Sequence, residues 1–298
     1  MDMFDERAYE RRSKELIPVR MKIALEGFFC EVEKFEIAPE LMVRRAPLDE
    51  RQAFWSRTNN PKDVEQKALD NEFFAEFDFH IPRGLIQGLA PGNGINLVSI
   101  FFSVVSANIL NINRGNFYLV NGKEFQSAGF YTMPNEYRFA SKVKFTSDEL
   151  NSLRVFWPSF KGEFEGNFSF ALVARRYFYS QLRLNLEDRI IDLMITLEAL
   201  LVPEKSGTKG EKIATRLAQM ISPEHDSSVV RILSSEAYRL RNKIIHGGRA
   251  HLAEAFDIDL MSKYCRAAIR KYLICYKGLS SRQLIKVLSP GDDCNYAK

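Results

Sequence analysis

An arginine and a histidine near the end of one predicted helix are the residues best suited to chemistry. The segment reads Arg241-Asn-Lys-Ile-Ile-His246. Unpaired carbonyls in the last turn of a helix favour a protonated imidazole by ~0.3–1 kcal/mol, so His246 can give or take a proton near neutral pH. Arg241 can hold a phosphate and offset charge in a transition state. Together these two groups suffice for attack of an RNA 2′-hydroxyl on its neighbouring phosphate, a route that needs no metal and leaves a cyclic phosphate.

The helix that carries this pair must turn it away from the core. Asn242 and His246 are four residues apart and therefore share a face, about 200° around the helix from Leu240. The core-facing stripe, with a spacing of four, three and four, is Leu233, Ala237, Leu240 and Ile244. The outward polar set is Arg239, Arg241, Asn242 and His246, with Arg241 able to swing toward His246. From spacing alone a structural role is favoured, because Arg and His near a helix end usually cap carbonyls or pair with acidic residues.

One glutamate and one glycine-containing segment elsewhere are weaker candidates. Glu198 lies on an apolar helix, where it either orients a motif residue or forms a partly buried pair with an arginine such as Arg216. The segment 207–212, Gly-Thr-Lys-Gly-Glu-Lys, fails the spacing of a phosphate-binding loop and follows no strand, so it is interpreted as a linker.

The remaining histidines and one aromatic cluster favour structural roles. His80 alternates with strand residues at a predicted surface position, while His225 and His251 lie in loops beside the motif helix and are interpreted as solvated, although either could touch a substrate. The run Tyr177-Phe-Tyr179 could stack on bases, but on an apolar stripe it is more often core.

Composition sets limits on the class of protein. The chain is 46% hydrophobic and 27% charged, which is ordinary for a globular protein. No run of about 18 apolar residues exists, and the acidic start lacks the layout of a secretory signal, so a cytoplasmic protein without membrane contact is expected. The cysteines are scattered and no histidines cluster with acidic residues at a metal-binding spacing, so neither a disulfide framework nor a metal site is expected.

Charge is unevenly distributed. Residues 1–165 hold 21 Lys and Arg against 24 Asp and Glu, a net of −3, whereas residues 166–298 hold 21 against 14, a net of +7. This modest excess suits a polyanionic partner without demanding one.

The first half of the chain is predicted to be rich in strands. Residues 5–26 have helical composition, residues 47–58 could hold a short helix, and Asn59-Asn-Pro61 is typical of a loop. Alternation over residues 73–81 predicts a half-buried strand, and the apolar run 95–105, after the loop-like Pro91-Gly-Asn-Gly94, predicts a strand buried on both faces. Asn121-Gly122 between apolar runs is the clearest hairpin signal, and further strands are expected at 129–132 and 138–145.

The second half is predicted to be helical. Thr146-Ser-Asp-Glu149 is a capping-box pattern, and Asn185 is placed to cap the helix that Pro203 ends. Helices are expected at 168–183, at 185–202, at 211–221, from Ser222-Pro223 to His246, at 253–277 and at 282–288. The sequence therefore predicts an α+β protein, with a β-rich domain over residues 1–145, either an antiparallel sheet or a sandwich, and an all-helical bundle over residues 146–298.

Three blocks of the C-terminal half resemble the HEPN superfamily, specifically its ApeA-like branch. They are Leu197-Glu-Ala-Leu-Leu201, Lys212-Ile-Ala-Thr-Arg-Leu-Ala218 and Tyr238-Arg-Leu-Arg-Asn-Lys-Ile-Ile-His-Gly-Gly248. The signature of that family is an arginine and a histidine separated by four to six residues, with a polar residue directly after the arginine. Arg241, Asn242 and His246 match all three positions.

The resemblance implies a helical bundle that commonly forms a homodimer, in which two motifs face each other across a composite cleft. It implies a metal-independent endoribonuclease without cofactor, acting on RNA in anti-phage defence, abortive infection or a toxin-like system. Arg241 would polarise the scissile phosphate, His246 would act as general acid or base, and Asn242 would position either one. Supporting or substrate-binding roles fall to Glu198, Arg216, Arg239 and Lys243.

Two alternatives remain at this point. The bundle could be a non-catalytic HEPN module that binds a nucleotide or mediates dimer assembly. Alternatively, residues 1–145 could be the functional part, with the bundle as a dimerising scaffold. An extra N-terminal domain in this family is expected to sense or regulate, which allows a nucleotide or a phage-derived trigger to act through residues 1–145.

Overall fold

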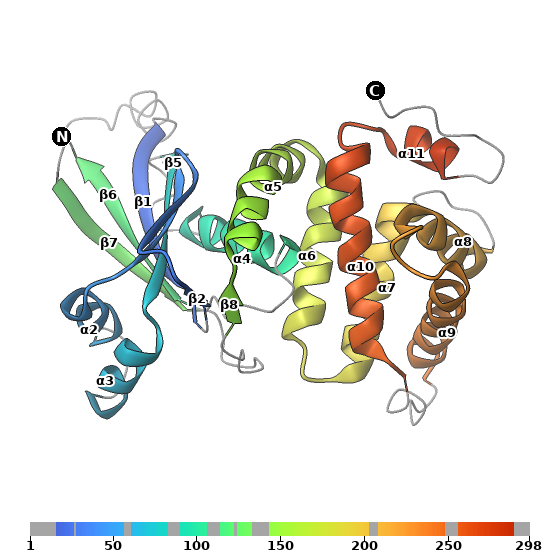
Figure 1. Ribbon diagram of the computed structural model, residues 1–298, viewed down its shortest axis with the longest axis horizontal. Helices are drawn as coiled ribbons and strands as arrows, with labels where there is room; N and C mark the ends of the chain where they lie inside the picture. The colour runs from blue at the N-terminus through green and yellow to red at the C-terminus, as the bar shows by residue number, and fades with distance from the viewer. Residues whose placement is uncertain are drawn as a thin grey trace, which may run out of the picture. The chain divides into compact units, whose positions relative to one another are not determined.

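An antiparallel sheet followed by a mostly helical region makes up the computed structural model (Figure 1). The structure describes residues 16–26, 28–56, 61–82, 90–105, 114–121, 124–132, 143–202, 208–247 and 256–288. Contacts divide the chain into one unit of residues 1–102, 108–135 and 139–154 and another of residues 103–107, 136–138 and 155–298. The division therefore falls inside helix α5 (Ser147–Gly166), a few residues beyond the predicted boundary at 145.

Six strands of the described residues form one sheet in the order β3-β4-β5-β1-β6-β7, with every neighbouring pair antiparallel. Their bounds are β1 Leu16–Ala24, β3 Lys34–Ala38, β4 Leu41–Arg45, β5 Phe73–Pro82, β6 Arg114–Asn121 and β7 Glu124–Thr132. A short parallel pair joins β2 (Phe28–Cys30) to β8 (Val143–Phe145). The first unit thus contains an open sheet, one of the two architectures predicted for it.

β1 corrects the helical prediction for residues 5–26 over its described part. It pairs with β5 on one side and β6 on the other, with Met21 opposite both Phe77 and Phe117. Val19, Met21 and Ile23 are buried while the residues between them turn to the other face. A strand with two hydrogen-bonded neighbours gains ladder bonds and packing that outweigh weak helical propensity.

The second face of the sheet carries ion pairs. Glu50 of α2 (Leu48–Ser56) accepts hydrogen bonds from Lys22 at 2.5 Å and Arg44 at 2.7 Å, and Arg44 also bonds Glu76 at 2.7 Å. Burial alone would raise the pKa of Glu50, but these bonds outweigh it and lower that pKa. α2 is therefore held to the sheet by charge as well as by its buried Phe54 and Trp55.

Replacing Glu50 by glutamine should lower the unfolding free energy at pH 7 and make that free energy fall less steeply as the pH is lowered. A lowered folded-state pKa means that the unfolded state binds more protons, so the stabilisation is complete above the unfolded pKa of about 4.3 and is lost as pH falls through the folded pKa. Urea unfolding between pH 3 and 7 measures this, with Glu65→Gln at an exposed position of α3 (Pro61–Asp70) as control. Equal pH profiles for the two variants would contradict the assignment.

The apolar run 95–105 is helical, so the predicted strand is wrong. It belongs to α4 (Ala90–Val105), whose first turn also takes in the Pro-Gly-Asn-Gly segment expected to be a loop. Side chains 97–105 are all buried, including Ser99 and Ser103. An element apolar on every side lacks the periodicity that separates a helix from a strand.

Some of the other predictions for the first unit are confirmed and others are wrong. The strand at 73–81, the helix at 47–58 and the strand at 129–132 are confirmed by β5, α2 and β7. The hairpin is confirmed by β6 and β7, but Asn121 pairs with Glu124, so the two linking residues are 122 and 123, outside the described residues. β8 covers the end of the strand expected at 138–145. Pro61, expected in a loop, begins α3, and β2, β3 and β4 were not predicted.

Side-chain caps set most helix starts in the described part of the second half. Thr146 and Glu149 form the predicted capping box, with the Thr146 N–H donating to Oε2 at 2.8 Å and the Glu149 N–H donating to Oγ1 at 3.3 Å. Asn185 caps α7 by accepting from the Glu187 N–H at 2.8 Å. The helices after α5 are α6 Phe168–Leu182, α7 Leu186–Leu201, α8 Lys209–Ile221, α9 Ser227–Ile245, α10 Ile258–Lys271 and α11 Ser281–Val287.

α7 is the central helix of this unit. It contacts α6, α8, α9, α10 and α11, and Leu193, Met194 and Leu197 are fully buried there. α10 is shorter than the helix expected at 253–277 and continues into a π-helical turn, Tyr272–Tyr276.

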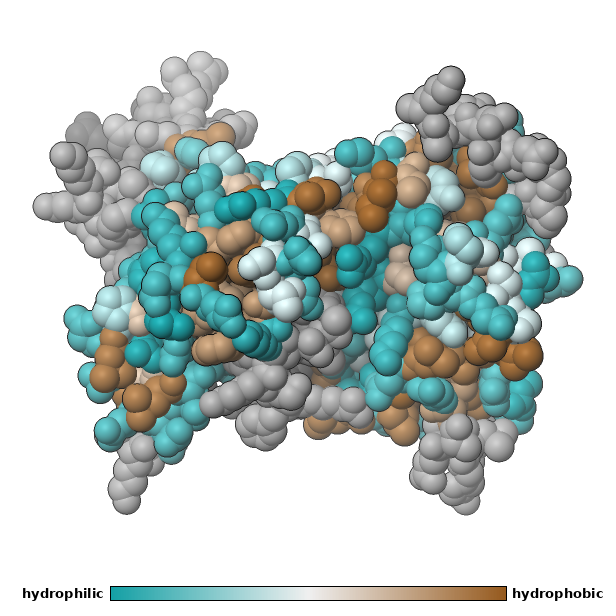
Figure 2. Space-filling model, viewed as in Figure 1, coloured by the Kyte–Doolittle hydropathy of each residue, from teal (hydrophilic) through white to brown (hydrophobic). Residues whose placement is uncertain are grey.

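Figure 2 shows hydrophilic side chains over much of the visible described surface, with smaller hydrophobic patches among them. No helix among the described residues is long and apolar enough to span a membrane.

The sequence predicts one apolar stripe on α6, formed by Phe168, Leu172, Tyr179 and Leu182, but the buried face of the helix differs from it. Of these four residues only Leu182 is buried. Phe168 is 83% exposed and Tyr179 is 40% exposed, whereas Phe170, Tyr177 and Phe178 are buried. The core interpretation of Tyr177 and Phe178 is thus confirmed, while that of Tyr179 is wrong. α7 and α10 both pack against α6, and their placement selects the face that is buried.

Candidate functional site

α9 places the arginine–histidine motif. Asp226, rather than the expected Ser222-Pro223, begins it: the Asp226 carboxylate accepts from the Ser228 N–H at 2.8 Å and the Val229 N–H at 3.3 Å. The helix ends at Ile245, and the following Gly247 has φ +77, a left-handed conformation that glycine adopts without strain. The predicted stop after His246 is therefore confirmed.

His246 lies at the C-terminal cap of α9 and is exposed. The backbone N–H of His246 donates to the backbone carbonyl of Asn242 at 3.1 Å, and the backbone N–H of Gly247 donates to the carbonyl of Ile244 at 3.1 Å. Asn242 is half-buried. The imidazole is accessible and the backbone that carries it is fixed by the end of the helix.

Arg241 turns toward α7 rather than outward. Its Nη2 lies 3.4 Å from Glu198 Oε1, and its Nη1 donates to Asn242 Oδ1 at 3.0 Å. Its Cζ lies 5.9 Å from the centre of the Tyr238 ring. The side chain is 24% exposed, so instead of the expected outward direction with a swing toward His246 it takes a direction toward Glu198. The attraction of a largely buried carboxylate on another helix explains its direction.

Glu198 connects three helices. This α7 side chain is 16% exposed and pairs with Arg241 of α9 and with Lys209 of α8, whose Nζ lies 3.5 Å from Oε2. Both interpretations of Glu198 fit this contact, because the arginine that pairs with it is itself the motif residue Arg241. Arg216, the arginine suggested as its partner, is buried and donates from Nη1 to the carbonyl of Leu201 at 2.7 Å.

Close packing fixes the start of α8 against the motif helix. A Cβ atom on Gly210 would lie 2.5 Å from Cδ1 of Tyr238, closer than any real contact allows. Part of the segment 207–212, interpreted as a linker, is therefore a packed helical turn, with Lys209 and Gly210 in α8. Neither Lys209 nor Gly210 was predicted at this site. Tyr238, against which Gly210 packs, is three residues before Arg241 and so shares its face.

The other predicted residues are not gathered at this point. Arg239 pairs with Glu236 of its own helix at 3.6 Å, and Lys243 is exposed. His225 is half-buried, edge-on to Tyr264 with ring centres 5.1 Å apart. His80 is exposed on β5 as expected, and His251 lies outside the described residues. Within the described ranges no three His, Cys, Asp or Glu residues are grouped so that they could hold a metal ion.

Replacing Glu198 by glutamine should cost about 1–2 kcal/mol of unfolding free energy, because Arg241 and Lys209 lose the negative charge of a mostly buried partner. Glu236→Gln is the matched control: its pair with Arg239 is about half exposed on both sides, so its loss should cost less than about 0.5 kcal/mol. Urea unfolding at pH 7 measures both. Equal losses would show that the Glu198 contact contributes no more than a surface pair.

The site and fold define a mixed α+β protein with an exposed histidine and a tethered arginine on one helix of its helical unit. No family model matches the chain, and comparison with curated proteins and with solved structures likewise finds no match.

Proposed function

We propose that this chain is a metal-independent endoribonuclease of the HEPN type, acting in anti-phage defence or a toxin-like system. The observation that supports it most is that one helix carries both an exposed His246, at its C-terminal end, and an Arg241 whose orientation is set by Glu198 and Asn242. Charged groups held in place before substrate arrives stabilise a transition state without reorganisation.

In the proposed reaction His246 removes the proton of an RNA 2′-hydroxyl. The 2′-oxygen then bonds to the adjacent phosphorus, and the bond from phosphorus to the 5′-oxygen of the next nucleotide breaks. That 5′-oxygen takes a proton from a second imidazolium, supplied by His246 of a second copy in a homodimer. The products are a 2′,3′-cyclic phosphate and a 5′-hydroxyl, while Arg241 offsets charge on the phosphoryl oxygens and Asn242 positions it.

One observation favours a second function, a non-catalytic module that binds a nucleotide or mediates assembly. The Arg241 guanidinium already has two partners inside the fold, Glu198 and Asn242. A structural arginine would have such contacts whether or not RNA is cleaved. In that case substitution at Arg241 or His246 changes ligand binding or oligomeric state and no RNA product depends on it.

The deciding experiment is a cleavage assay with the full chain. RNA is taken from bacteria that express the chain from an inducible promoter, with and without infection by a panel of phages, and from purified chain incubated with RNA in EDTA. New ends that resist alkaline phosphatase until acid opens the ring carry a cyclic phosphate, whereas a 3′-monophosphate is removed directly. Cyclic-phosphate ends that depend on His246 support the proposal, and intact RNA under every condition overturns it.

A further inference from the structure

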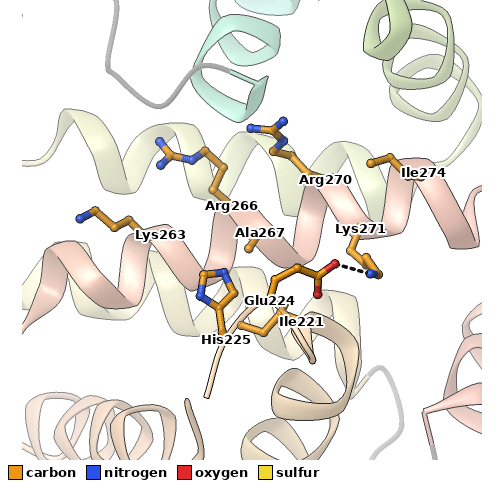
Figure 3. A pocket seen from close by; sticks show the side chains of 9 residues that line it. All are labelled: Ile221, Glu224, His225, Lys263, Arg266, Ala267, Arg270, Lys271 and Ile274. Carbon is orange, nitrogen blue, oxygen red and sulfur yellow. Dashed lines mark hydrogen bonds and ion pairs between the residues drawn. The ribbon is translucent and has the colours of Figure 1, made fainter. Parts of the chain in front are cut away.

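A second feature of the helical unit has no part in the proposed cleavage. A hollow of ≈ 410 Å³ lies beside α10 and is bordered by the connection from α8 to α9 (Figure 3). Four basic side chains line it, Lys263, Arg266, Arg270 and Lys271, together with one carboxylate, Glu224. Its lining therefore carries a net positive charge.

The basic residues of α10 form a regular array. Lys263, Arg266 and Arg270 are spaced by three and four residues and so follow one stripe, with the ends about 10 Å apart along the axis at 1.5 Å per residue. Figure 3 shows Arg266 and Arg270 extending side by side from the same side of α10. Two neighbouring guanidiniums in this arrangement match the oxygens of phosphate groups.

The carboxylate is engaged at one end of the hollow. Glu224 Oε1 accepts from Lys271 Nζ at 2.8 Å, shown as the dashed line in Figure 3. Lys271 is therefore neutralised locally, and the positive charge of the lining is concentrated along Lys263, Arg266 and Arg270. An anion is therefore expected beside Lys263, Arg266 and Arg270 rather than beside Glu224.

Arg270 is held in position before any ligand binds. Its Nη1 donates to the carbonyl of Val105 at 3.3 Å, and its Cζ lies 4.9 Å from the centre of the Phe156 ring. Burial, and then the charge of Arg266, lower the pKa of Arg270. An anion between the two would relieve this repulsion, and a pre-positioned guanidinium loses little entropy on binding.

Apart from His225, the rest of the lining is apolar, and the size of the hollow fits a small molecule. Ile221, Ala267 and Ile274 contribute hydrocarbon surface, and His225 is steadied by its edge-on contact with Tyr264. Small-molecule sites commonly occupy about 300–1,000 Å³ and combine apolar walls with a few charged groups. The three basic residues extend over about 10 Å, which suits two neighbouring phosphate groups of a small molecule rather than many phosphates of a nucleic-acid backbone.

We propose that this hollow binds a small phosphorylated molecule of nucleotide size. Its phosphates lie against Lys263, Arg266 and Arg270, and its base lies against Ile221, Ala267 and Ile274. The site shares no residue with the α9 motif, so ligand binding does not depend on the proposed cleavage.

Isothermal titration calorimetry of the full chain tests this with three probes: pyrophosphate, ATP in EDTA, and a ten-nucleotide 2′-O-methyl RNA. ATP and pyrophosphate are expected to bind with Kd below about 1 mM and to compete with each other. Lys263→Glu should weaken ATP at least about tenfold, because it reverses a charge at an exposed position without disturbing the core. Arg270→Gln should weaken it similarly, with thermal unfolding recorded alongside.

Matched controls separate this site from general charge effects. Arg282→Glu changes charge equally at an exposed position of α11 outside the lining and should bind ATP as the wild type does, as should His246→Ala. The proposal is overturned if neither small probe binds, or if Lys263→Glu and Arg270→Gln bind like wild type. Binding of the RNA alone, without competition by pyrophosphate, also overturns it and assigns the surface to a nucleic-acid backbone.

Discussion

Replacing His246 by alanine should reduce RNA cleavage by about 10²–10⁴-fold, the range that a positioned general acid or base contributes. The side chain is exposed at the end of α9, so unfolding free energy should change by less than about 0.5 kcal/mol. Initial rates of cyclic-phosphate formation measure the first effect and circular dichroism with urea unfolding the second. A loss of cleavage without loss of stability is the expected combination.

Arg241 needs a gentler substitution, because alanine would leave Glu198 without its α9 partner. Arg241→Lys keeps a positive charge near Glu198 but removes the planar fork that holds a phosphate through two hydrogen bonds. It should lower cleavage by about 10²-fold or more and leave the oligomeric state unchanged. Arg231→Ala, at an exposed position on the same helix, is the control and should cleave as wild type does.

Two results would contradict the catalytic assignment. One is cleavage by the His246 and Arg241 variants at the wild-type rate. The other is dissociation of a dimer by both variants while the wild type cleaves no RNA, which is the result that the assembly function predicts.

Phe170→Ala is expected to destabilise the protein by about 3–5 kcal/mol, whereas Phe168→Ala should change stability by less than about 0.5 kcal/mol. Phe170 is 2% exposed, with its ring stacked on Tyr272 at 5.4 Å and edge-on to Phe160 at 6.0 Å. Phe168, two residues earlier on the same helix, is 83% exposed. The truncation opens a cavity at one site and only removes surface at the other.

Urea unfolding of both variants gives the comparison, and the unfolding slope shows whether each still unfolds in one transition. The pair is matched in residue type, helix and substitution, so helix propensity cancels between them. If Phe168→Ala were the more damaging, the buried face of α6 would be the stripe that its sequence predicts, and the packing of α7 and α10 against α6 would have to differ.

Helix ends were the features most readily predicted, because each depends on residues a few positions apart. The Thr146–Glu149 capping box, the Asn185 cap and the stop at Gly247 all rest on hydrogen bonds or backbone angles within one turn. The start of α9 was misplaced by several residues, since a second capping residue, Asp226, follows the proline signal. Such choices between neighbouring signals depend on where the preceding helix packs.

Elements whose structure depends on distant partners were the least predictable. The run 95–105 has an apolar face in every direction and was expected to be a strand, yet it is part of α4. β1 has helical composition and is nevertheless a strand, because β5 and β6 offer it hydrogen-bond partners from distant parts of the chain. In both cases long-range packing decides between two locally acceptable structures.

The properties of the Arg241–His246 motif divide in the same way. Sequence alone determined that Arg241, Asn242 and His246 lie at the end of a helix and that His246 is turned to solvent, since both follow from helical periodicity and a glycine stop. Only the tertiary structure decided that Arg241 turns to Glu198, that Lys209 and Gly210 pack at the same junction, and that α10 borders a basic hollow. Those contacts join residues far apart in the chain, and a buried carboxylate or a neighbouring ring has its effect only once separate helices have packed together.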